Sequence, residues 1–232
     1  MAKDNAVHRA YLEIRDQIVT GARAPGSPLI ERRVAQAVGA SRTTVRNALQ
    51  QLANEGFVTV SSIGSHYSRF FVAPMNVDEM REWYYIFGAL DGIAARGAAG
   101  LPEARRKGVV ERGRRLAREI VAAGEADPPQ YDRIAGLDAA FHGSYVQAGA
   151  GPRLHSVHAF LRPHVDRYGT FYLTELLRKI PSEVHQEHCA IMDAIEAGDP
   201  DAAEQAGIAN WRNATIRFET IMRQRGEAGR GR

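Results

Sequence analysis

The stretch PGSPLIERRVAQAVGASRTTVRNALQQLANEGFVTV, residues 25–60, decides the fold of the N-terminal part of the chain. We expect a helix from Glu31 to Val38 that ends at Gly39, because glycine readily adopts the left-handed turn that closes many helices. A further helix begins at Ser41, whose hydroxyl is a good N-cap. Its apolar side chains share one face, formed by Val45, Ala48, Leu49 and Leu52. This pattern predicts two helices joined by a tight turn, the second with one buried face.

Elements on either side of this stretch complete a small domain. Apolar residues recur at helical spacing over residues 7–18, which predicts a preceding helix. After the quoted stretch, the apolar runs 57–60 and 70–72 flank a polar turn and predict a two-stranded β-hairpin. Residues 1–74 are therefore expected to form a winged helix-turn-helix domain.

The remainder of the chain carries only helical periodicity, broken by Gly and Pro. Six or seven helices follow from the expected breaks at 100–102, 124–129, 149–152, 169–170, 181 and 198–200. We expect an all-α helical bundle over residues 77–222, so that the whole protein is mainly α. Residues 223–232 are rich in Gly and Arg and are expected to form a disordered tail.

Length and composition narrow the class of protein. The 232 residues are 44% hydrophobic, enough for two modest domains that each bury a core. No apolar run approaches the roughly 18 residues of a membrane span, and the N-terminus is charged where a signal peptide is apolar. We expect a cytoplasmic protein without membrane contact. Its single cysteine, Cys189, excludes an internal disulfide and leaves histidines and carboxylates as metal ligands.

Positive charge is concentrated in the first third of the chain, although the formal net charge is only +3. Residues 1–74 hold 9 Lys and Arg against 5 Asp and Glu, a net of +4. Residues 75–232 hold 21 against 22, a net of −1. This division is expected if the first third faces an anionic polymer.

The helix that begins at Ser41 carries the chemistry needed to read DNA. Arg42 and Arg46 are four residues apart and share its exposed face. Arginine can donate two hydrogen bonds to a guanine or clamp a phosphate. An isolated pair of arginines would be better explained as a solvated face. Here the charge, the turn, the apolar inner face and the hairpin agree, and we interpret this helix as a recognition helix in the major groove.

The quoted stretch resembles the DNA-binding domain of GntR-type bacterial regulators. Their pattern joins a Pro-Gly turn, a Ser/Thr-Arg-x-x-Val/Leu-Arg recognition helix and a Glu-Gly-hydrophobic exit. The resemblance implies DNA contacts by Arg32, Ser41, Arg42, Thr43 and Arg46, and in the wing by Gly64 and His66. The wing, SSIGSHYSRFFV, is longer and less basic than the common Arg-Gly form.

A small group of polar residues stands out in the helical part. Asp138 and His142 are four residues apart in LDAAFHGSY and project from one helix face. His188, on a later helix, is bracketed by the apolar residues Ala190 and Ile191. A histidine on an inward face is more often a hydrogen-bonded core residue than a metal ligand, so spacing alone leaves both interpretations open.

Residues 77–222 resemble the FCD-type helical effector domain of the FadR subfamily. Its marks are an Asp-x-x-x-His helix, a Glu-His-x-x-Ile-x-x-Ala-Ile segment, Gly-Asp and a last histidine, which LDAAFH and EHCAIMDAIEAGD match. The resemblance implies that a divalent ion, zinc, nickel or manganese, is held at Asp138, His142, His188 and Asn210. Asn210 stands where histidine is usual, and an amide oxygen is the weaker donor for zinc or nickel.

The effector side of this domain departs from the family pattern. Many relatives carry Arg-x-x-Leu-Glu on the first helix, whereas this chain has Phe87 where the arginine stands. Phe87 cannot offer charge to a carboxylate, so we expect an effector less acidic than the usual small organic acids. Arg162 could supply the missing charge, and His155 and His158 could share a face with the pocket.

Together these features predict a sequence-specific transcriptional regulator, a repressor rather than an enzyme. We expect a homodimer on a palindromic operator, controlled by a metabolite bound in the helical domain. Two alternatives remain, a metal-dependent hydrolase that uses the Asp/His cluster and a helical module that binds DNA without sequence preference. The hydrolase lacks an evident nucleophile or a His-Glu-x-x-His helix and would leave the basic helix unexplained.

Overall fold

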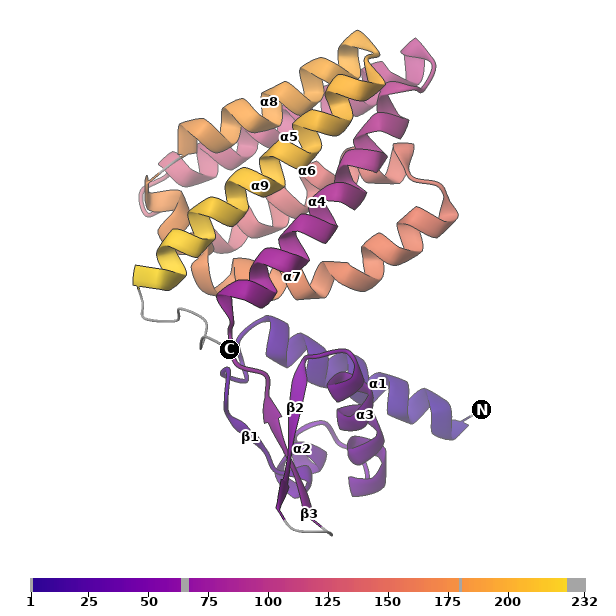
Figure 1. The fold of residues 1–232 in the computed structure, drawn as a ribbon, viewed down its shortest axis with the longest axis vertical. Coiled ribbons are helices and arrows are strands. Elements are labelled where there is room, and N and C mark those ends of the chain that lie inside the picture. The colour runs from indigo at the N-terminus through magenta and orange to yellow at the C-terminus, as the bar shows by residue number, and fades with distance from the viewer. Residues whose placement is uncertain (1, 64–66, 180, 225–232) are drawn as a thin grey trace. The chain divides into compact units, whose positions relative to one another are not determined.

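A computed structural model of the chain describes residues 2–63, 67–179 and 181–224 (Figure 1). The chain forms two compact units, Met1–Met75 and Asn76–Arg232. Each unit has a hydrophobic core of its own. Among the described residues, no helix is long and apolar enough to cross a membrane.

Unit 1 has the predicted winged helix-turn-helix fold. Its helices are α1 (Ala2–Val19), α2 (Glu31–Ala37) and α3 (Arg42–Asn54), and its strands are β1 (Pro28–Leu29), β2 (Val58–Ile63) and β3 (Tyr67–Val72). Gly39 makes the turn between α2 and α3 with a φ of 62°, a conformation that favours glycine. The apolar faces of α1 and α3 meet the inner side of the hairpin in one core.

The sheet of unit 1 has one strand more than the sequence predicted. β2 and β3 form the expected antiparallel hairpin, in register from Val58 opposite Val72 to Ile63 opposite Tyr67. β1 adds to the free side of β3, which gives the order β1-β3-β2. A strand of two residues is too short to show alternation, so the pattern could not reveal it.

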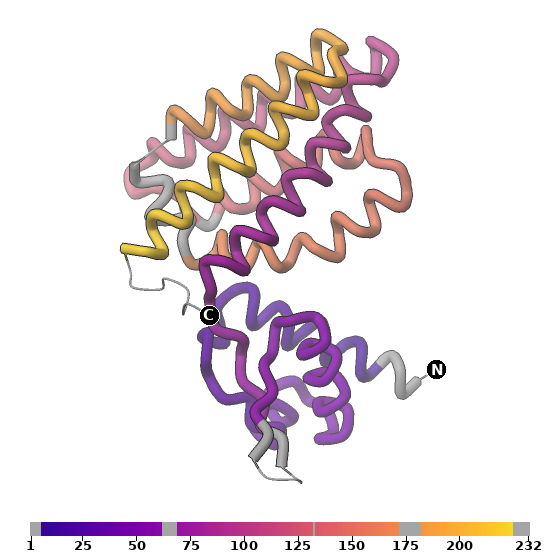
Figure 2. Tube along the Cα trace, in the orientation of Figure 1, coloured from indigo at the N-terminus to yellow at the C-terminus, as the bar shows by residue number. Residues whose placement is uncertain are grey.

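Unit 2 is an all-α bundle, as predicted. Its helices are α4 (Val77–Ala99), α5 (Glu103–Glu125), α6 (Tyr131–Gly149), α7 (Pro152–Lys179), α8 (Pro181–Ala197) and α9 (Pro200–Gln224). The expected break at residues 169–170 is wrong, because α7 runs through both residues without interruption (Figure 2). A glycine inside a helix costs only about 1 kcal/mol, and the buried residues Val165 and Tyr168 anchor this segment.

The helix α9 ends at Gln224, two residues beyond the boundary expected at Met222. The disordered tail stays a prediction, because residues 225–232 lie outside the described residues.

Small residues bring α4 and α9 close together along their length (Figure 1). A Cβ atom on Gly88 would lie 2.6 Å from the Cβ of Trp211, and one on Gly92 would lie 2.9 Å from the carbonyl oxygen of Glu204. Both distances are shorter than a packed carbon atom allows. This close approach places the α4 residues between Gly88 and Gly92 directly against α9.

Candidate functional site

The recognition helix α3 is fixed by its cap and by its buried face. The Ser41 hydroxyl accepts a hydrogen bond from the Thr44 backbone N–H at 3.1 Å, as an N-cap does. Its apolar side chains are fully buried, namely Val45, Ala48, Leu49 and Leu52. The side chains of Arg42 and Arg46 are 71% and 60% exposed. The helix therefore presents both arginines outward from a rigid support.

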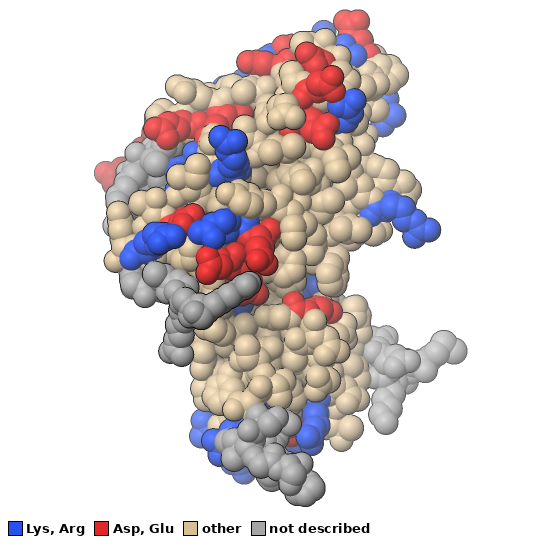
Figure 3. Space-filling model, in the orientation of Figure 1, with Lys and Arg blue, Asp and Glu red and all other residues tan. Residues whose placement is uncertain are grey.

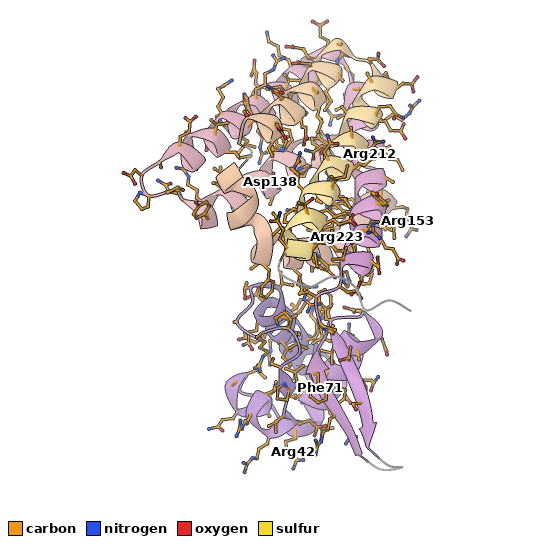
Figure 4. The ribbon with its side chains drawn as sticks, turned by 60° about the vertical axis from the view of Figure 1, so that its left-hand side comes forward. Arg42, Phe71, Asp138, Arg153, Arg212 and Arg223 are labelled. Carbon is orange, nitrogen blue, oxygen red and sulfur yellow. The ribbon has the colours of Figure 1, made fainter. Side chains whose placement is uncertain are left out.

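The predicted DNA-contacting residues that the structure describes all lie at the surface of unit 1. Ser41, Arg42, Thr43, Arg46 and Arg32 are exposed, and the three arginines line one groove. Figure 3 shows Lys and Arg side chains at the lower end of unit 1. In Figure 4 the Arg42 side chain points outward from the body of this unit. Gly64 and His66 lie outside the described residues, so their contacts stay predictions.

A groove of about 750 Å³ lies beside α3 and adds a residue that the sequence argument missed. It is lined by Pro28, Leu29, Ile30, Glu31, Arg32, Arg42, Arg46, Arg69, Phe70 and Phe71. Arg69 enters it from β3, where it is exposed while Phe70 and Val72 are buried. The signal was present, because Arg69 is the only Lys or Arg between Arg46 and Arg81. An arginine on the wing strand can reach a phosphate.

In unit 2, three of the four predicted metal ligands converge. Asp138 and His142 lie one turn apart on α6, and His188 comes from α8. One ligand atom of each lies within 4.8 Å of the other two. The Nε2 atoms of His142 and His188 are 3.9 and 3.5 Å from the Asp138 carboxylate oxygens. One carboxylate and two imidazoles suit zinc, nickel or manganese.

The imidazole of His142 is oriented by groups on its far side. Its Nδ1 atom lies 2.7 Å from the Oδ2 atom of Asp91 and 2.7 Å from the Tyr145 hydroxyl. This leaves Nε2 directed at Asp138. Such outer partners are typical of metal-binding histidines, because they fix the ring and its tautomer. Nε2 of His142 could therefore act as a metal ligand.

Asp91 on α4 is the centre of a buried network and is 0% exposed. It accepts hydrogen bonds from Trp211 Nε1 at 2.8 Å and from the Tyr145 hydroxyl, and His158 Nε2 lies 3.1 Å away. Burial alone would raise the pKa of this carboxyl. The charge of His142 and the hydrogen bonds from His142, His158 and Tyr145 outweigh burial and hold its pKa well below the usual range. Asp91 is therefore ionised.

The pKa values of the two histidines of the cluster are shifted in opposite directions. Burial lowers the pKa of His188 to about 4, so this imidazole is neutral at physiological pH, the form that binds metal. Burial also disfavours the charged form of His142, but the charge and hydrogen bond of Asp91 and the charge of Asp138 raise its pKa above the usual value. The His188 ring stacks on Phe141 with centroids 3.9 Å apart, and its buried Nδ1 has no hydrogen-bond partner among the described residues.

Asn210, the fourth predicted ligand, makes a different contact in the structure. Its amide nitrogen donates to Glu187 Oε2 at 3.0 Å. Glu187 precedes His188 on α8 and is also held by Asn213 and by both terminal nitrogens of Arg217. The amide nitrogen of Asn210 on α9 is thus committed to Glu187. Its role as a ligand stays a prediction.

The four residues expected at an effector pocket are only partly brought together. Phe87 is buried and packs on His158, with ring centroids 4.3 Å apart. The Arg162 guanidinium lies 5.9 Å from the Phe87 ring and pairs with Asp166 at 2.6 Å. His155 is exposed, whereas His158 is buried. The two positions are only about 60° apart around the helix, so the edge of the buried face of α7 falls between them.

Asp91, Tyr145 and Trp211 were missed by the sequence argument. A signal existed for Asp91, since it is the one charged residue in the otherwise small and apolar run FGALDGIAA, residues 87–95. A charge on a buried helix face requires partners. Which residues supply them depends on packing between helices, which the sequence does not show.

Comparison with known proteins agrees with this geometry. Residues 6–66 match the model of bacterial regulatory proteins of the gntR family, and residues 82–212, more than half of the chain, match the FCD domain. The chain belongs to the GntR family of regulators. A GntR helix-turn-helix followed by an FCD domain is the FadR-type architecture that the sequence predicted.

Relatives of this GntR regulator carry matching names. An HTH-type transcriptional regulator in an unstable DNA locus of Streptomyces ambofaciens is 32% identical over 200 residues, 84% of this chain and 78% of the relative. A D-xylose utilization operon transcriptional repressor of Paenarthrobacter nicotinovorans is 31% identical over 202 residues, 84% and 82% of the two chains. A crystal structure of a GntR regulator from Rhodococcus sp. RHA1 shares the fold, with a TM-score of 0.66, 22% identity and coverage of 91% and 96%.

Proposed function

We propose that this GntR regulator is a homodimer that binds a palindromic operator, with one α3 helix in each half-site. The observation that carries the proposal is the exposure of Arg42 and Arg46 above the fully buried face of α3. A single winged helix reads only a few base pairs, so two symmetric half-sites match a two-fold protein. Operator binding places the protein in the cytoplasm, where bacterial DNA lies.

Repression is the direction of control that we propose. The Paenarthrobacter nicotinovorans relative is named as a repressor. We propose the same direction of control for this chain, and we do not propose the same sugar as its effector. A winged helix bound at a promoter would block RNA polymerase sterically. This mode of repression requires no separate surface on the regulator for contact with polymerase.

The metal site of the FCD domain is the second part of the proposal. Asp138, His142 and His188 would hold a divalent ion, with Asn210 completing the set. The buried neutral imidazole of His188 and the Asp91 contact to His142 support this assignment. Such an ion would offer coordination to oxygen atoms of an effector.

The effector is proposed to be a small metabolite that carries little negative charge. Phe87 is buried beside His158 and Trp211 and offers no charge to a carboxylate. The nearby guanidinium of Arg162 is already paired with Asp166. Residues around the cluster therefore favour a neutral, partly apolar ligand.

Selection of duplexes from a randomised library by the purified protein tests the DNA-binding proposal. We expect the selected sequences to share an inverted repeat, and sedimentation to show two chains on each duplex. Selected sequences without a common motif would support a non-specific DNA-binding module instead. One chain bound to a full repeat would contradict the dimer. The names of the relatives give no support to the hydrolase alternative.

A further inference from the structure

An acidic residue lies inside the basic groove of unit 1. The Glu31 Oε2 atom is 3.8 Å from Arg42 Nη2, and its Oε1 atom is 3.7 Å from Arg46 Nε. The Glu31 side chain is 20% exposed, far less than either arginine. One less exposed carboxylate at the start of α2 thus lies within 3.8 Å of both exposed guanidinium groups of the recognition helix.

The geometry leaves both arginines able to contact bases while they remain paired. Arg46 faces Glu31 with Nε, and its two terminal nitrogens have no partner among the residues that the structure describes. Arg42 faces Glu31 with Nη2 at 3.8 Å, which is longer than a hydrogen bond, so its two terminal nitrogens keep N–H groups available to a base. A guanine needs two donors, for O6 and N7, and each arginine still has them. Glu31 therefore does not compete with a base for the hydrogen bonds that matter.

A phosphate in the same place would interact differently with Glu31. A base edge carries no net charge, whereas a phosphate carries a full negative charge that the nearby carboxylate repels. Arg32 and Arg69 line the same groove and have no acidic partner among the residues that the structure describes. They are the groove arginines suited to the DNA backbone, and Arg42 and Arg46 are the ones shielded from it.

From this arrangement we propose that Glu31 directs Arg42 and Arg46 toward base edges and away from phosphates, so that it sets the ratio of operator to non-specific affinity. Glu31 acts through the arginines and is a positioning residue. The inference rests on the proposed function, in which these two arginines read the operator.

The test compares Glu31→Gln with wild type on two duplexes, the one selected from the randomised library and a scrambled duplex of equal composition. Affinities are measured across a range of salt concentrations. We expect affinity for the scrambled duplex to rise roughly three- to tenfold at low salt, with a salt slope steeper by about 0.9 for one added phosphate contact. Affinity for the selected duplex rises less, so the specificity ratio falls.

Glu13→Gln is the matched control, because Glu13 is an exposed acid on α1 that bonds only to Gln17 among the described residues. It removes the same charge from the same unit and should leave the specificity ratio unchanged. Thermal unfolding checks that each variant folds. If Glu31→Gln does not fold, Glu31→Asp withdraws the carboxylate by one methylene and should lower the ratio by a smaller factor.

Two outcomes would overturn the inference. One is an unchanged ratio of selected to scrambled affinity in Glu31→Gln, whether or not both affinities rise. The other is the same change of this ratio in Glu13→Gln as in Glu31→Gln. If wild type itself did not prefer the selected duplex, the proposed function would fail and the inference with it. If wild type and Glu31→Gln preferred the selected duplex to the same extent, the proposed function would stand and only the inference about Glu31 would fail.

Discussion

The imidazole of His142 and the carboxylate of Asp91 meet 2.7 Å apart in the interior of the FCD domain. The contact joins α6 to α4 and leaves the other ring nitrogen of His142 facing Asp138. Asp91 also accepts from Trp211 on α9. The cluster of Asp138, His142 and His188 is thereby connected to α4 and α9, so a change at the cluster can alter the packing of these two helices.

Replacing Asp91 by Asn should weaken metal binding and destabilise the domain. The variant keeps the size of the side chain but removes the charge that orients His142. We expect a loss of metal affinity of roughly 10- to 100-fold, as for other outer partners of metal ligands. Removing one charge of a buried pair should also lower the free energy of unfolding by about 3 kcal/mol. Competition with a chromophoric chelator measures the first effect, and chemical denaturation the second. Unchanged metal affinity in a folded variant would mean that Asp91 serves packing alone.

Asn210→His should tighten metal binding, and His188→Ala should remove it. Histidine restores the imidazole that is usual at this position. We expect the gain in metal affinity to exceed the cost of losing the Asn210 hydrogen bond to Glu187, which is about 1 kcal/mol. Titration of metal-free protein with zinc, nickel and manganese gives the affinities. Equal affinities for Asn210→His and wild type would place Asn210 outside the coordination sphere.

Arg42→Ala and Arg46→Ala should each remove operator preference and leave the fold intact. Both side chains are largely exposed, so their loss costs little packing. Losing a bidentate base contact should reduce discrimination by about 1–3 kcal/mol. Binding to the selected and scrambled duplexes gives this difference directly. A variant that kept wild-type discrimination would show that its arginine does not read bases.

Arg69→Gln should weaken DNA binding by the same factor on every sequence. Arg69 lines the groove from the wing strand β3 and is assigned a phosphate contact. Its loss should reduce the salt slope by about 0.9 and leave the specificity ratio unchanged. Arg33→Gln is the control, since Arg33 is an exposed neighbour on α2 that does not line the groove. If both variants behaved alike, Arg69 would contribute only to the general charge.

The DNA-binding half could be read from the sequence because its signals are local. The Ser41 cap, the turn at Gly39 and the apolar face of α3 all lie within a few residues of one another. Hydrophobic periodicity fixes which side of α3 is exposed, and so it also places Arg42 and Arg46 correctly. The same signals miss β1, because its pairing with β3 depends on residues that are distant in the chain.

The interior of the FCD domain was harder to predict because its contacts join separate helices. Spacing brought Asp138 and His142 onto one face, and the family resemblance added His188. The network around Asp91 depends on the close approach of α4 to α9 at Gly88 and Gly92, which no pattern within one helix reveals. The break expected at Gly169 failed for a related reason, since packing of α7 outweighs the weak helix propensity of one glycine.

Operator affinity with and without metal is the measurement that tests the account most directly. The selected duplex is titrated with protein loaded with zinc, nickel or manganese and with protein freed of metal by a chelator. We predict that loading changes operator affinity by about 5- to 150-fold. The Asp138→Asn variant should not respond, and its partly exposed side chain makes it the mildest way to remove a ligand. Equal affinity of loaded and metal-free wild type for the duplex would contradict control of DNA binding through the cluster.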